Sequence, residues 1–179
     1  DRDFSAFASM FGAYLLAGPD ETAVVEQVIK QSAEPIERLR IPVLEKMHAL
    51  LKARLALARR DPAQALRLAQ ALREPDELYL THEVLLDAYW ASAQWDDALA
   101  EANWLASHRG RAYAEYGGHY LQRPYDVALS TVALLRAAEC AARLQRADAV
   151  REHLAAFDRA WPARTLPEVL QQRRDALEQ

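Results

Sequence analysis

The residues that could carry out acid–base or metal chemistry stand in this chain as adjacent pairs. His82-Glu83 and Glu152-His153 each place an imidazole beside a carboxylate, and Asp96-Asp97 places two carboxylates together. Neighbouring side chains diverge around a helix, whereas ligands that share an ion or a proton are usually three or four residues apart. Acidic residues such as Asp96 also favour the positive end of a helix dipole. We therefore expect the three pairs to lie on helix surfaces, with no metal and no cofactor bound.

Longer catalytic motifs are absent from the sequence. It contains no His-Glu-x-x-His, no paired cysteine motif and no phosphate-binding glycine loop. Cys140 is the only cysteine, which excludes an internal disulfide and predicts a small core residue. We therefore expect no catalytic residue and no enzymatic activity in this chain. The chain starts at Asp1 without an initiator methionine or signal peptide, so we expect one domain over 1–179 cut from a longer protein.

Composition narrows the class of partner. The chain has 179 residues, of which 51% are hydrophobic and 27% charged, and its net charge is −4. This balance is typical of a water-soluble domain and does not favour binding to nucleic acid. No apolar stretch approaches the ~20 residues that a membrane-spanning helix needs. We expect a cytoplasmic protein with no nucleic-acid or membrane partner.

Aromatic and basic residues gather in one segment, 104–125. It holds four tyrosines, three arginines and two histidines, types that contribute strongly to binding interfaces. The candidate partner-binding residues here are Arg111, Tyr113, Tyr116 and His119. Two interpretations stay open. The segment is either an interaction surface, such as one that binds an anion, or a long helix and an Ω-like connection whose tyrosines pack over a neighbouring helix pair.

The elements that must position these residues are helices. Apolar residues recur at helical spacing, and no segment alternates with a period of two. The pattern predicts an all-α fold of about eight or nine antiparallel helices. We expect helices near 3–17, 20–34, 35–60 with a restart at Pro42, 62–73, 75–93, 125–145, 147–160 and 166–178, and a further helix that begins at Trp95.

The helices repeat one design, in which a helix with a small residue at its crossing is followed by a turn and a second helix opening on a small residue. Three copies lead up to Ala65, Ala98 and Val150, and a fainter one leads to Ala23. Small residues let two helix axes approach to about 8–10 Å. The spacing is irregular, with 33 residues from Ala65 to Ala98 but 52 from Ala98 to Val150. A helical array with alanine-rich crossings but no true repeat is the alternative.

These units resemble tetratricopeptide repeats, whose two-helix units span about 34 residues. The best copy carries Leu85, Tyr89, Trp95, Ala98, Ala102 and Leu105 at matching places. The resemblance implies a right-handed solenoid with a concave surface lined by the first helix of each pair. The inner positions are Arg54, Glu83, Asp87, Trp90, Glu139 and Arg143. None is an asparagine, so the clamp for a peptide's terminal carboxylate found in some members of this family is not expected.

A narrower likeness concerns the segment from Trp104 to Glu115 and the run Phe157–Pro162. Both are similar to the C-terminal repeats of bacterial cyclases assigned to peptide-modification systems. The resemblance implies a catalytic domain elsewhere in the parent protein.

Three functions follow from these patterns. The first is a repeat scaffold that binds a protein or peptide on its concave surface through Arg54, Asp87, Trp90, Glu139 and Arg143. The second is a regulatory or dimerising region of a multidomain signalling enzyme, whose partner is another domain or a second copy in a homodimer. The third is a helical enzyme with a site around His108, Tyr113, Glu115 and His119.

Overall fold

The computed structural model describes residues 2–115, 122–161 and 165–178, and within these ranges it has helices and no strand. This confirms the all-α prediction. The helices are α1 (Arg2–Leu16), α2 (Thr22–Leu39), α3 (Pro42–Ala58), α4 (Pro62–Gln70), α5 (Tyr79–Ala91), α6 (Trp95–Ser107), α7 (Arg109–Ala114), α8 (Gln122–Arg143), α9 (Ala147–Ala160) and α10 (Glu168–Asp175). The short α7 was not expected.

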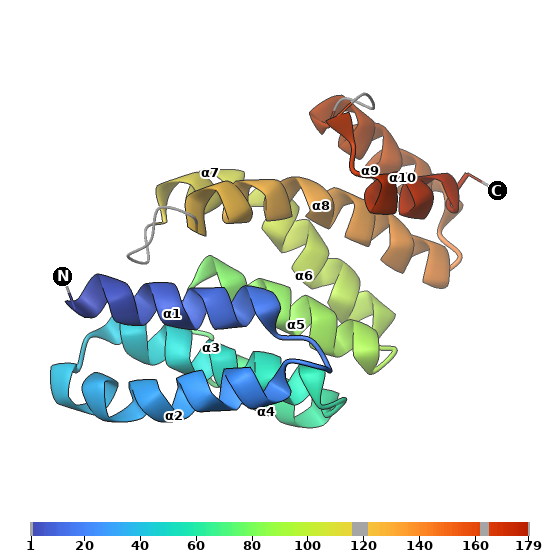
Figure 1. Ribbon diagram of the computed structural model, residues 1–179. Coiled ribbons are helices and arrows are strands. Elements are labelled where there is room, and N and C mark those ends of the chain that lie inside the picture. The colour runs from blue at the N-terminus through green and yellow to red at the C-terminus, as the bar shows by residue number, and fades with distance from the viewer. Residues whose placement is uncertain (1, 116–121, 162–164, 179) are drawn as a thin grey trace.

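The helices form four successive hairpins (Figure 1), α1 with α2, α3 with α4, α5 with α6, and α8 with α9. The second helix of each hairpin also contacts the first helix of the next one, and α1, α3 and α5 pack side by side. The last helix, α10, lies against α8 and α9, because Leu170 is buried with Leu135, Leu154 and Phe157. The arrangement is compatible with a helical repeat.

Three of the hairpin turns are built alike. Arg60, Ala93 and Gln145 each adopt a left-handed conformation, with φ of 61°, 54° and 57°. In each turn the next residue's N–H donates to the carbonyl five residues earlier, at 2.9 Å. This bond and the left-handed residue are those of the Schellman motif, which satisfies carbonyls at the end of a helix. The bonds are Asp61 to Ala56, Gln94 to Tyr89 and Arg146 to Ala141. The copies thus share a backbone turn as well as a sequence pattern.

The residue expected to open the second helix is fully buried in two of the four copies. Ala65 and Ala98 are fully buried, which allows close approach of the paired helices. Val150 is half-buried, and Ala23 is exposed. The register of the first copy is therefore wrong, because Val25 is the fully buried residue of α2.

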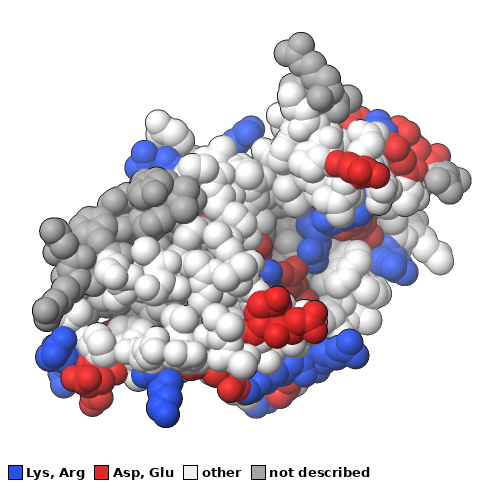
Figure 2. Space-filling model, viewed as in Figure 1, with Lys and Arg blue, Asp and Glu red and all other residues white. Residues whose placement is uncertain are grey.

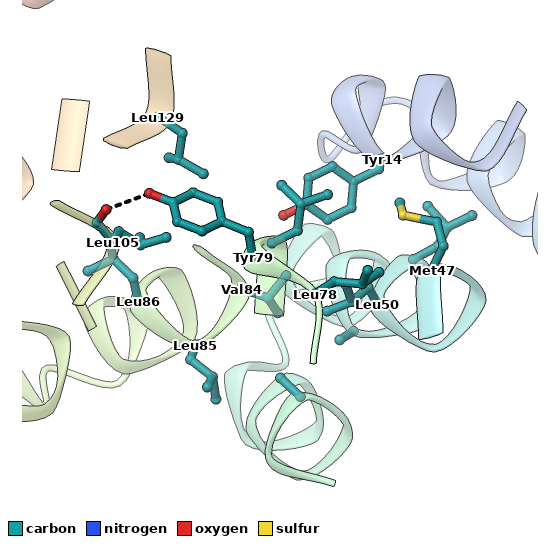
Figure 3. Close-up of a cluster of buried hydrophobic side chains, with 14 of the residues drawn as sticks. Tyr14, Met47, Leu50, Leu78, Tyr79, Val84, Leu85, Leu86, Leu105 and Leu129 are labelled. Atoms are coloured by element: carbon teal, nitrogen blue, oxygen red, sulfur yellow. Dashed lines mark hydrogen bonds between the residues drawn. The ribbon is translucent and has the colours of Figure 1, made fainter. Parts of the chain in front are cut away.

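One hydrophobic core runs through the first three hairpins into α8. Figure 3 shows Tyr79 at its centre, between Leu105 and Leu129 on one side and Tyr14 on the other. The Tyr79 hydroxyl donates a 2.5 Å hydrogen bond to the Leu105 carbonyl, so a buried polar atom is satisfied. This core fixes the relative positions of α1, α5, α6 and α8.

Two prolines act differently from each other. Pro42 is the first residue of α3, as predicted. The predicted cap of α4 is also present, because Asp61 accepts a 2.9 Å hydrogen bond from the Gln64 N–H. Pro35 was expected to follow the end of a helix but lies inside α2. A proline removes one backbone bond, and α2 continues past it because Ile36 is buried in the core.

Within the described ranges no helix is long and apolar enough to cross a membrane.

Candidate functional site

Five side chains from four helices form a chain of alternating charges, which we call the ionic ladder. Arg54 lies 2.5 Å from Asp87, and Arg136 lies 3.0 Å from the other oxygen of Asp87. Arg136 also approaches Glu139 at 3.7 Å. Arg173 donates two hydrogen bonds to the carboxylate of Glu139, at 2.7 and 2.8 Å. The ladder therefore links α3, α5, α8 and α10 across one side of the molecule.

The ladder residues are half-buried, with side-chain exposures between 15% and 33%. Figure 2 shows acidic and basic side chains at the bottom of a hollow between the α1–α5 part of the molecule and α8–α10. Partly exposed pairs contribute little net stability, but loss of one partner leaves a charge poorly compensated. The ladder thus holds fixed charges in a place that a second molecule could reach.

Trp90 stands beside the ladder between two arginines. The guanidinium carbon of Arg136 is 4.9 Å from the ring centroid of Trp90, and that of Arg143 is 5.9 Å away. Trp95 meets Trp90 edge to face at 4.9 Å, and Arg143 lies 5.7 Å from its ring. Both tryptophans are half-buried, and Arg143 is exposed. We call Trp90, Trp95, Arg136 and Arg143 the Trp90 cluster.

Glu83 takes a different role from the one its inner position predicted. It is buried, and its two oxygens accept 2.6 Å hydrogen bonds from the hydroxyls of Tyr14 and Tyr125. Burial raises the pKa of Glu83, and the nearby Arg54 guanidinium opposes that rise. The Arg54 guanidinium also lies 5.2 Å from the Tyr14 ring centroid. Glu83 is therefore a buried neighbour of Arg54 and is not available as a surface contact.

A second buried acid lies at the start of α8. Asp126 is fully buried, and its Oδ2 accepts a 3.2 Å hydrogen bond from Gln122. Its Oδ1 has no hydrogen-bond partner among the described residues. Burial, reinforced by the Glu115 carboxylate, raises the pKa of Asp126 to about 8. This group links stability to pH, since both burial and a neighbouring carboxylate oppose its ionisation in the folded protein.

The residues predicted in segment 104–125 divide by role. Arg111 donates to the backbone carbonyl of Glu77 and lies 5.5 Å from the centroid of Trp104. Glu115 accepts the backbone N–H of Tyr79 at 2.9 Å. Arg111 and Glu115 thus fasten α7 to the start of α5, which favours the packing interpretation for them. Tyr113 is 65% exposed. Tyr116 and His119 lie outside the described residues.

The expectation of surface histidine–glutamate pairs was wrong for His82. Its ring is fully buried, 2.5 Å from Glu101 and 3.0 Å from Glu77, and stacks on Trp104 at 3.3 Å. His108 stacks on the same indole at 4.1 Å. The carboxylates of Glu77, just before α5, and of Glu101, in α6, are therefore the hydrogen-bond partners of the buried imidazole.

The other pairs remain near the surface. Glu152 is exposed and His153 half-buried, and Asp96-Asp97 is exposed in the first turn of α6 as predicted. Among the described residues no group of three or more histidines, cysteines, aspartates or glutamates is placed to hold a metal ion.

The structure brings together Arg54, Asp87, Trp90, Glu139 and Arg143, all of them predicted site residues. It adds Arg136 and Arg173, which sequence reasoning missed. Arg136 lies three residues before Glu139, on the same turn of α8, and helical spacing could have identified it. No spacing signal connects Arg173 with Glu139, 34 residues away.

Comparison with known proteins adds no relative. No protein-family model matches the sequence, and no curated protein or solved structure does so either.

Proposed function

We propose that this protein is a tetratricopeptide-like repeat scaffold that binds a protein or peptide segment on the side carrying the ionic ladder. The observation that carries the proposal is the convergence of half-exposed Trp90 and arginines from separate helices in one cluster beside the ionic ladder. Tryptophan and arginine dominate binding hot spots, because they combine large contact area with several donors. The comparable turns at Arg60, Ala93 and Gln145 support the repeat architecture.

The ladder suits recognition better than catalysis. Its carboxylates are engaged by arginines at 2.5 to 3.0 Å, so none is held ready to take a proton from a substrate. Fixed side chains bind with less loss of conformational entropy than mobile ones. A segment laid along the hollow would meet preorganised charges and one aromatic anchor.

A selection experiment tests this function. Peptides selected from a random display library on the immobilised protein should bind in solution, and Trp90→Ala should weaken them by at least ~1–2 kcal/mol, the usual size of a hot-spot loss. Asn103→Ala, an exposed change on α6, is the control and should leave affinity unchanged. Selected peptides that bind Trp90→Ala as well as the wild type would contradict the proposal.

One observation favours the alternative, a regulatory or dimerising region of a multidomain enzyme. Arg173 of α10 already donates two hydrogen bonds to Glu139 of α8, so one segment of this chain is bound to another through the ladder. Another domain of a parent protein, such as the cyclase domain that the narrower likeness implies, would then be the partner. Arg173→Ala should strengthen binding of a competing segment if α10 blocks the ladder.

A further inference from the structure

Arg143 differs from the other arginines of the ionic ladder and the Trp90 cluster. Arg54, Arg136 and Arg173 each contact a carboxylate within 3.0 Å. Among the described residues Arg143 has no such partner, and its contacts are the rings of Trp90 and Trp95. Its side chain is exposed at the last residue of α8. The guanidinium thus lies within cation–π distance of two indoles while its N–H donors remain open.

We infer that Arg143 and the two tryptophans form a subsite for an acidic side chain, glutamate or aspartate, of the bound segment. The inference rests on the proposed function and specifies the chemistry of its partner. Arginine forms paired hydrogen bonds with a carboxylate, and its flat guanidinium can stack on an aromatic ring at the same time. The rings therefore orient the donor without using its hydrogen-bonding capacity.

Charge balance at the hollow points to the same ligand. The ionic ladder and the Trp90 cluster together hold four arginines against the carboxylates of Asp87 and Glu139, and the buried Glu83 beside Arg54 is a third acid, which leaves one arginine in excess. Local positive excess attracts acidic segments and repels basic ones. Arg136 is engaged by Asp87, so Arg143 is the cation that remains for an incoming carboxylate.

The subsite takes a side-chain carboxylate and not a chain terminus. A terminal carboxylate is usually fixed by several donors that also hold the last backbone groups. Here one guanidinium is open, and the adjoining surface is the apolar area of two indoles. An acidic residue followed or preceded by an apolar one within a segment matches both parts.

Paired peptide probes test the subsite. Peptides from the display selection are made N-acetylated and C-amidated, in versions with glutamate, glutamine or lysine at each position, and their affinities are measured by fluorescence anisotropy. At one position glutamate should bind about tenfold more tightly than glutamine, as expected for a charge-assisted bond. Raising the salt concentration should reduce this preference, since the pair is solvent-exposed.

Variants assign the preference to Arg143. Arg143→Gln should reduce the glutamate-over-glutamine ratio to about one, while Arg143→Glu should reverse it toward lysine. Arg159→Gln removes the same charge from an exposed position on α9 and should leave the ratio unchanged. Circular dichroism melting of each variant confirms that it is folded. The charge reversal keeps the test decisive if one variant is unstable.

The outcomes separate this inference from the proposed function. Peptides that depend on Trp90 but show no acidic preference, or keep it in Arg143→Gln, would overturn the subsite and leave the scaffold intact. Acidic preference that appears only in peptides with a free C-terminus would overturn the side-chain assignment. Selected peptides that ignore Trp90 altogether would refute both proposals.

Discussion

Replacing Asp126 by asparagine should make the protein more stable, and increasingly so as the pH rises. Asp126 is fully buried, with one oxygen bonded to Gln122 at 3.2 Å. Burial and the Glu115 carboxylate raise its pKa to about 8. Between the pKa of aspartate in the unfolded chain and the raised pKa of Asp126, folding therefore requires either uptake of a proton or ionisation of a buried group. Both lower the free energy of unfolding.

The sign and size follow from linkage between protonation and folding. In the unfolded chain an aspartate has a pKa of about 3.9, so it loses its proton below the pH at which the folded protein does. Stability from protonated Asp126 is fully present below pH ~4 and falls by about 1.4 kcal/mol per pH unit until pH ~8. Asparagine does not titrate, so the advantage of Asp126→Asn should grow by about 4 kcal/mol between pH 5 and pH 8.

Urea unfolding at constant ionic strength, from pH 5 to pH 8.5, measures this difference directly. Asp158→Asn is the matched control. The hydrogen bonds that Arg174 donates lower the pKa of Asp158. The stability that ionised Asp158 contributes is therefore lost only as the pH falls through that lowered pKa. The difference in unfolding free energy between wild type and Asp158→Asn should therefore stay constant from pH 5 to pH 8.5. Parallel stability curves for wild type and Asp126→Asn would refute the argument that burial holds a proton on Asp126.

Three further changes test the repeat geometry and the segment after α6. Ala93→Gly should raise the unfolding free energy in urea by about 0.5–1 kcal/mol, because the backbone of Ala93 is in the left-handed conformation that glycine favours. As the control, Ala100→Gly inside α6 should lower it by about 1 kcal/mol. Ala98→Trp should overpack a fully buried crossing and cost at least ~1–3 kcal/mol, seen as a lower melting temperature. Arg111→Ala should cost about 1 kcal/mol because the half-buried carbonyl of Glu77 loses its hydrogen bond. Exposed Tyr113→Ala should change stability by less than ~0.5 kcal/mol.

Local patterns in the sequence predicted most helices and several of their ends. The 147–160 helix, the start at Pro42 and the Asp61 cap all depend on residues within a few positions of one another. Pro35 was misjudged because a local rule ends a helix near proline, while burial of the next residue, Ile36, sustains it. Propensity is thus overridden where tertiary packing contributes more.

The candidate site was predictable only in part for the same reason. Arg54, Asp87, Trp90 and Glu139 were predicted from the resemblance to two-helix repeats, which assigns them to the inner face of the first helix of each pair. Which of them pair, and which are buried, depends on partners far along the chain. Glu83 meets Tyr125 across 42 positions, and Glu139 meets Arg173 across 34. No periodicity in one sequence encodes those distances.

Indole signals give the most direct test of the central claim that the ladder side of the molecule is the binding surface. The chain has four tryptophans, so a nitrogen–proton correlation spectrum should show four indole signals, assigned by Trp→Phe changes. On addition of a selected peptide, the signals of Trp90 and Trp95 should shift, while those of Trp104 and Trp161 stay in place. Shifts of Trp104 or Trp161 with Trp90 and Trp95 unmoved would contradict the account and place binding elsewhere.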